Sequence, residues 1–132
     1  MRTVRYFLMA VLVMGLAAGL GMFQAADDAK PKYTIEEIME KAHKPPKSSL
    51  FVKVKSGKAS AEQKKELLEL YEEMAKNPAP KSEKGSPADW KKRTGALVKA
   101  AKDVIADKEG ATAELAKAAT CGKCHSVYKS DD

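Results

Sequence analysis

Apolar residues recur at helical spacing along most of this chain. From Ile35 to His43 they follow the i, i+3, i+4, i+7, i+8 pattern of one helix face, and Thr34 with Glu37 forms a capping box in front of them. The Pro45-Pro46 pair ends this first predicted helix after about ten residues, or about 15 Å. The pattern therefore predicts a short amphipathic helix at the start of the folded part.

Three longer amphipathic segments follow it. A second capping box at Ser60 begins a helix with a wide apolar stripe, and Ser86-Pro87 begins a third that runs to Lys108. The fourth runs from Ala111 to about Lys129, interrupted only by Gly122. The stretch of residues 50–55 alternates like a strand but has no partner strand, so we expect a short helix or an irregular connection there. Short loops between such helices predict an all-α fold, an antiparallel four-helix bundle.

The first 26 residues have a different character. Arg2 and Arg5 precede an unbroken apolar run of 17 residues, from Phe7 to Phe23, and small residues follow at Ala25-Ala26. This is the pattern of a secretory signal peptide, so we expect residues 1–26 to export residues 27–132 to the periplasm. The −3 position of the cleavage site lacks a small residue, so an uncleaved anchor is the alternative, although 17 residues is near the lower limit for spanning a bilayer.

Charge and length restrict the function further. Arg2 and Arg5 are the only charged residues among the first 26, so the chain's formal charge of +6 falls to about +4 for the remaining 106 residues. A domain of that size is near the small end of what buries its own core unaided, which favours a bound cofactor. Export argues against a nucleic acid partner. With no paired carboxylates, Ser/His set or phosphate-binding loop, we expect no enzymatic activity.

The most specific motif is Cys121-Gly122-Lys123-Cys124-His125, which contains both cysteines of the chain. The C-x-x-C-H arrangement attaches haem c, one haem held by two thioether bonds, and places a histidine next to the second thiol as an axial ligand. On a helix, positions 121, 124 and 125 share a face, so attachment and ligation come from one side. A zinc site lacks further ligands at proper spacing, a thioredoxin-like dithiol lacks its βαβ setting, and a disulfide this short would stabilise little.

The sixth ligand of the iron has three candidates. Met39 and His43 lie one turn apart on the first predicted helix, and an open position is the third. Met39 could instead be a core residue of its apolar stripe. His43 could instead be a solvated residue that interacts with the helix C-terminus.

The signal peptide, the four predicted helices and a C-x-x-C-H motif within the last dozen residues together resemble class II cytochrome c, the cytochrome c prime group and its low-spin relatives. More usual small cytochromes c carry the motif near the mature N-terminus with a Met ligand after it, whereas no Met follows Cys124 here. The resemblance implies that Cys121 and Cys124 are the thioether cysteines, that His125 is the axial histidine, and that Met39 is similar to the first-helix Met of low-spin members. Lys129 matches a basic residue that family members often carry after the axial histidine.

The sequence therefore predicts a periplasmic monohaem c-type cytochrome that carries single electrons between redox partners. Lys117, Lys123 and Lys129 form a positive rim that favours acidic partner proteins, or else an ordinary solvated surface. The alternative function is binding of nitric oxide or carbon monoxide at an open sixth position. We expect membrane contact only from an uncleaved anchor, and the pattern leaves monomer and homodimer open.

Overall fold

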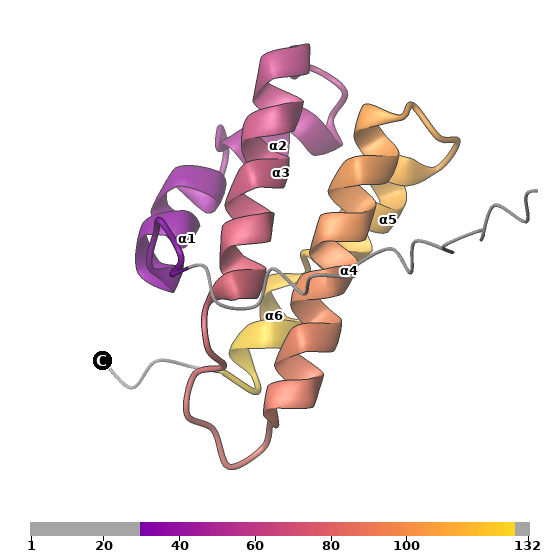
Figure 1. Cartoon of the computed structure of the whole chain (residues 1–132). Helices are drawn as coiled ribbons and strands as arrows, with labels where there is room; N and C mark the ends of the chain where they lie inside the picture. The colour runs from indigo at the N-terminus through magenta and orange to yellow at the C-terminus, as the bar shows by residue number, and fades with distance from the viewer. Residues whose placement is uncertain (1–29, 129–132) are drawn as a thin grey trace, which may run out of the picture.

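The computed structural model describes residues 30–128, and within this range the chain is all-helical, with six helices and no strand (Figure 1). The predicted signal peptide, residues 1–26, lies outside the described residues. The helices are α1 (Ile35–His43), α2 (Leu50–Lys55), α3 (Ala61–Lys76), α4 (Pro87–Ile105), α5 (Ala111–Ala118) and α6 (Cys121–His125). None of these helices of residues 30–128 has the length and apolarity needed to cross a membrane.

Side-chain caps begin α1, α3 and α4 where the sequence predicts. Complete capping boxes stand at Thr34 before α1 and at Ser60 before α3. The Ser49 hydroxyl accepts a hydrogen bond from the backbone N–H of Val52, at 3.3 Å. Because this cap satisfies an otherwise unpaired donor, residues 50–55 form helix α2 rather than an irregular connection.

The two longest helices, α3 and α4, pack against each other and form the centre of the fold. Residues 77–86 join them at one end, so they run in opposite directions, and α5 then returns along α4 (Figure 1). Helix α1 packs on α3, and α2 contacts α1, α3 and α5. Helix α6 lies near the end of the pair at which α4 begins (Figure 1).

The wide apolar stripe predicted for α3 is buried between its neighbours. Leu67 and Tyr71 are fully buried, and Leu70 and Met74 nearly so. Helix α4 supplies the facing layer, whose buried members are Trp90, Thr94, Leu97, Ala100, Ala101 and Val104. The apolar pattern of the sequence therefore identified the faces on which these helices pack.

The predicted single fourth helix is wrong, because the structure divides it into α5 and α6. The division is at Ala119-Thr120 and not at Gly122, where the sequence placed the interruption. The Thr120 hydroxyl donates to the carbonyls of Ala116 and Lys117, at 3.2 and 2.9 Å, and so occupies groups at the end of α5. Such side-chain bonding to the backbone competes with helix propagation, and it gives the C-x-x-C-H motif a helix of its own.

Candidate functional site

A cavity of about 1030 Å³ opens among the helices, and side chains from all six line it. This volume is at the top of the range of roughly 300–1,000 Å³ usual for small-molecule and cofactor sites. Much of the wall is apolar, with contributions from Ile35, Phe51, Val52, Met74, Trp90 and Leu97. The fold therefore encloses a space suited to a large apolar ligand with few polar contacts.

Helix α6 brings the three residues of the haem motif to this cavity. Cys121, Cys124 and His125 all line it. Both thiols are free, that of Cys121 exposed and that of Cys124 partly buried, and they form no disulfide with each other. Two free thiols and an imidazole thus reach one largely apolar cavity from a single helical turn.

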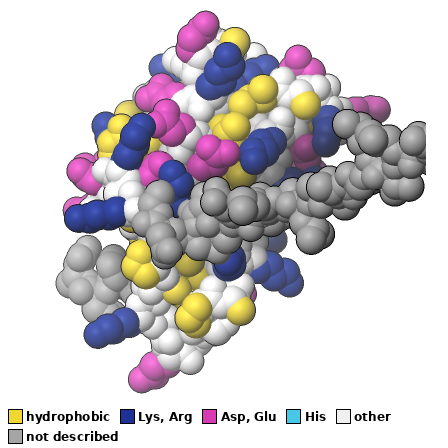
Figure 2. Space-filling model, viewed as in Figure 1, with side chains coloured by type: hydrophobic (Ala, Val, Ile, Leu, Met, Phe, Trp, Pro, Cys, Tyr) yellow, Lys and Arg dark blue, Asp and Glu magenta, His cyan; other side chains and the backbone are white. Residues whose placement is uncertain are grey.

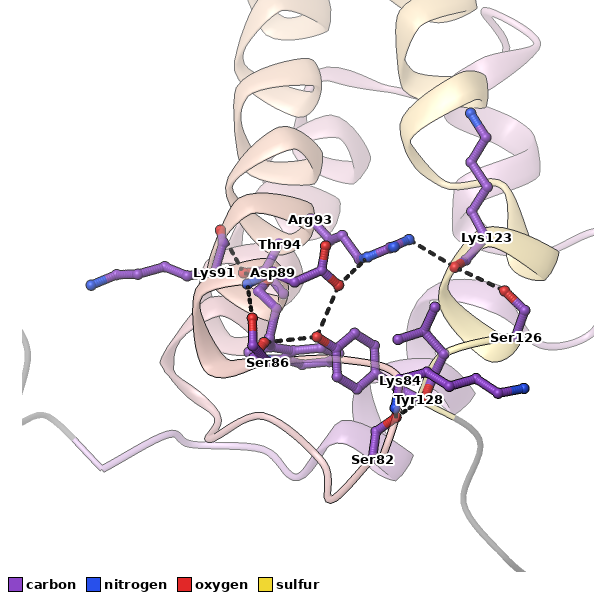
Figure 3. A network of polar contacts seen from close by, with 12 residues as sticks. Ser82, Lys84, Ser86, Asp89, Lys91, Arg93, Thr94, Lys123, Ser126 and Tyr128 are labelled. Atoms are coloured by element: carbon purple, nitrogen blue, oxygen red, sulfur yellow. Dashed lines mark hydrogen bonds and ion pairs between the residues drawn. The ribbon is translucent and has the colours of Figure 1, made fainter.

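Arg93 ties α6 to α4 next to the motif. Its Nη1 donates to the carbonyl of Lys123 at 2.7 Å, and its Nε donates to Asp89 at 2.7 Å (Figure 3). Tyr128, just after α6, donates from its hydroxyl toward Asp89 and the carbonyl of Ser86, at 2.9 and 2.8 Å (Figure 3). These contacts hold the middle of the short helix and the segment just after it against the beginning of α4.

The tether between α4 and α6, formed by Asp89, Arg93 and Tyr128, shifts the pKa values of its ionisable groups. The hydrogen bond from Arg93, followed by that from Tyr128, lowers the pKa of the Asp89 carboxyl. Burial, followed by the bond to Asp89, raises the pKa of the Tyr128 phenol. The sequence patterns did not identify Arg93 or Tyr128 as residues of the site. The i, i+4 spacing of Asp89 and Arg93 was the available signal.

Aromatic packing supports the same tether. Trp90 and Tyr128 meet edge to face with ring centroids 5.1 Å apart, and both line the cavity. The Trp90 indole N–H donates to the carbonyl of Asn77 at 3.0 Å, which fixes the loop between α3 and α4. Gly85 lies against the Tyr128 ring so closely that a Cβ there would overlap it.

Met39 and His43, the two sixth-ligand candidates, both line the cavity from α1. Met39 is partly buried beside the fully buried Ile38. The structure therefore brings both candidates into the same space as the motif of α6.

His43 is the last residue of α1 and is partly buried. Its ring packs on Phe51 and Tyr71 with centroid distances of 5.0 and 6.0 Å, and Nε2 lies 3.2 Å from the Tyr71 hydroxyl. Burial, followed by the charge of His125, lowers the pKa of His43. Burial, followed by the charge of Cys121, raises the pKa of Tyr71 above its usual range.

The predicted rim of lysines is only partly described. Lys117 pairs with Glu114 at 2.6 Å, Lys123 is exposed, and Lys129 lies outside the described residues. Basic and acidic side chains are interspersed on the face drawn in Figure 2. The cavity itself is lined by Lys44, Lys55 and Arg93 and, among acidic residues in the described part, by Glu36. This excess of positive charge suits carboxylates at the cavity edge.

The donor set fits a covalently held haem better than an ion held by side chains alone. Within residues 30–128, no three His, Cys, Asp or Glu side chains group so that they could hold a metal ion. Haem brings four nitrogen ligands of its own, so the protein supplies only axial ligands and attachment points. The small side chains of Ala118 and Ala119 line the cavity beside the thiols and leave room for a flat macrocycle.

Comparison of the chain with protein-family models, curated proteins and solved structures found no match.

Proposed function

We propose that this protein is a monohaem c-type cytochrome that carries single electrons between redox partners outside the cytoplasm. The observation that carries the proposal is the meeting of Cys121, Cys124 and His125 on one apolar cavity of cofactor size. Under this proposal the signal peptide of residues 1–26 exports the chain to the periplasm. The four helices of the proposed bundle are then α1, α3, α4 and the pair α5 and α6, which together correspond to the predicted fourth helix.

Each motif residue has a separate chemical task. Cys121 and Cys124 would hold the porphyrin by two thioether bonds, each formed by addition of a thiol S–H across a vinyl double bond, with sulfur on one carbon and hydrogen on the other. The His125 ring would offer a nitrogen lone pair to the iron. The Arg93 tether keeps α6 in place while both thiols and this ring face the cavity. When bound, the haem supplies an iron centre that alternates between ferric and ferrous states.

The cavity wall and the second axial ligand adjust the reduction potential. Apolar side chains such as Phe51, Trp90 and Leu97 exclude water, and low polarity around the iron favours its less charged, ferrous state. We propose Met39 as the second axial ligand, and a thioether ligand raises the potential relative to an imidazole. A relatively high potential suits a carrier that accepts electrons from one protein and passes them to another.

Basic side chains near the site favour acidic redox partners. Lys123 on α6 is exposed, and Lys44, Lys55 and Arg93 line the cavity. Part of this charge neutralises the two haem carboxylates, and the remainder attracts an acidic protein surface. Such attraction raises the association rate and weakens with salt.

The test is haem attachment, followed by the redox and coordination state. The full chain is expressed with a haem-attachment system, and acidic organic solvent is used to extract any haem that is not covalently bound. We expect the parent to retain one haem per chain and the double variant with Cys121→Ser and Cys124→Ser to retain none. Potentiometric titration should then give one reversible one-electron transition.

Two outcomes would contradict the proposal. A colourless parent would exclude a c-type cytochrome. A five-coordinate, high-spin ferrous spectrum that changes on addition of carbon monoxide would favour the gas-binding function over electron transfer. A six-coordinate low-spin spectrum in both oxidation states supports the electron carrier.

A further inference from the structure

Met39 and His43 compete for one position, and what distinguishes them is the surroundings of each side chain. Both line the cavity from α1. Within residues 30–128 the Met39 sulfur makes no hydrogen bond, whereas Nε2 of His43 lies 3.2 Å from the Tyr71 hydroxyl. The choice of axial ligand therefore depends on whether this contact persists.

Tyr71 is well placed to hold the histidine. It lies in the middle of α3 and is fully buried, and it is not among the side chains that line the cavity. The His43 ring stacks on it at an angle of 28° and is covered by Phe51 of α2 as well. Since a buried hydroxyl left without a partner is costly, the Tyr71 phenol favours the position of His43 in which the contact is made.

The contact removes Nε2 of His43 from coordination in either tautomer. If Nε2 carries the proton and donates to Tyr71, it has no lone pair for a metal. If Nε2 is unprotonated, its one lone pair accepts the hydrogen bond from the Tyr71 hydroxyl. Only Nδ1 is left, and it is the ring nitrogen beside Cβ, close to the backbone of α1. The thioether of Met39 has no such competing partner.

We propose that Tyr71 determines the axial ligand of the iron: by engaging Nε2 of His43 it leaves the position to Met39. This inference rests on the proposed function, because it assigns a specificity-determining residue to the same haem site. The identity of the axial ligand then depends on Tyr71 of α3 as well as on the two candidate residues of α1. Removing one hydroxyl, at a residue outside the cavity wall, should then exchange the ligand.

The experiment is Tyr71→Phe in the full, haem-loaded chain. The parent should show the far-red charge-transfer band of ferric iron bound to a thioether. We expect Tyr71→Phe to lose this band, to remain low-spin and to have a lower midpoint potential, since the freed imidazole replaces the thioether. Tyr33→Phe is the control, because Tyr33 is a partly buried tyrosine that, like Tyr71, does not line the cavity, and its hydroxyl makes no hydrogen bond within the described residues.

A second variant keeps the inference testable if Tyr71→Phe does not fold. His43→Gln retains a hydrogen-bond partner for Tyr71 and has no imidazole, so it should keep the thioether band and the parent potential. Combining it with Tyr71→Phe should restore the thioether band. If the parent lacks the thioether band and His43→Gln loses the low-spin spectrum of the parent, His43 is the ligand and the inference is wrong.

The outcomes separate this inference from the proposed function. A parent without covalent haem overturns the proposed function and the inference with it. A haem-bearing parent with bis-imidazole iron overturns the inference alone, whereas five-coordinate ferrous iron contradicts both the inference and the electron-carrier function. A folded Tyr71→Phe variant that keeps both the thioether band and the parent potential also overturns the inference alone.

Discussion

Truncation of Ile38 tests how α1, the helix of both sixth-ligand candidates, is held in place. Ile38 and Ala42 are the two buried residues of this nine-residue helix, and both have 0% exposure. Replacing a fully buried isoleucine by alanine costs about 2–5 kcal/mol, depending on how far the site collapses. Ile38→Ala therefore truncates the larger of the two fully buried side chains of α1.

Taking about 3 kcal/mol for this loss, the population with α1 undocked should rise by about 100-fold, since about 1.4 kcal/mol corresponds to a factor of ten. Native-state hydrogen exchange of the α1 amides measures that population directly. We expect the amides of α1 to exchange about 100-fold faster in Ile38→Ala than in the parent. The haem-loaded variant should also show more high-spin iron, because Met39 leaves the cavity whenever α1 undocks.

Leu115→Ala is the matched control. Leu115 is also fully buried, but it lies in α5, away from α1. Its truncation should lower the global free energy of unfolding without speeding exchange in α1, because Leu115 stays buried when only α1 opens. Equal acceleration of the α1 amides in both variants would refute the reasoning, since it would mean that α1 opens only when the whole domain unfolds.

Three further predictions concern the tether and the cofactor. Because Arg93 and Tyr128 lower the pKa of Asp89 in the folded state, its contribution to stability is present above its unfolded pKa and is lost as pH falls through the folded pKa. The melting temperature of the parent should therefore fall below about pH 4, and that of Asp89→Asn should fall less over the same range. Gly85→Ala should lower the melting temperature because its Cβ overlaps the Tyr128 ring, whereas Gly95→Ala, with open space around it in α4, should raise it. Protein made without haem attachment should show weaker helical circular dichroism and a lower melting temperature than the haem-loaded protein, because a ligand bound only to the folded state stabilises it.

Much of the fold followed from local patterns. Capping residues and apolar spacing placed α1, α3 and the start of α4, because a helix start depends on side chains within three or four residues. The break before α6 was missed for a physical reason. Thr120 is unremarkable in a helical pattern, and its hydroxyl ends α5 only by bonding the carbonyls of the preceding turn.

The residues of the candidate site likewise fall into two groups, those that the sequence identified and those that only the structure shows. The sequence identified Cys121, Cys124 and His125, because the C-x-x-C-H spacing by itself indicates haem attachment. It did not identify Tyr71, which is 28 residues from His43, or Arg93, which is 30 residues from Lys123. No periodic pattern marks such pairs, because each contact exists only after the helices have packed.

The sequence by itself determined the all-α class, the faces on which α3 and α4 pack and the single turn that carries both thiols and an imidazole. These properties depend on neighbours along the chain, and helical geometry brings such neighbours together. Tertiary structure alone decided that Met39 and His43 share a cavity with that turn, and that the partly buried His43 ring packs against Phe51 and Tyr71. The environment of a side chain, and with it the nitrogen or sulfur it can offer to a metal, depends on which distant segments pack around it.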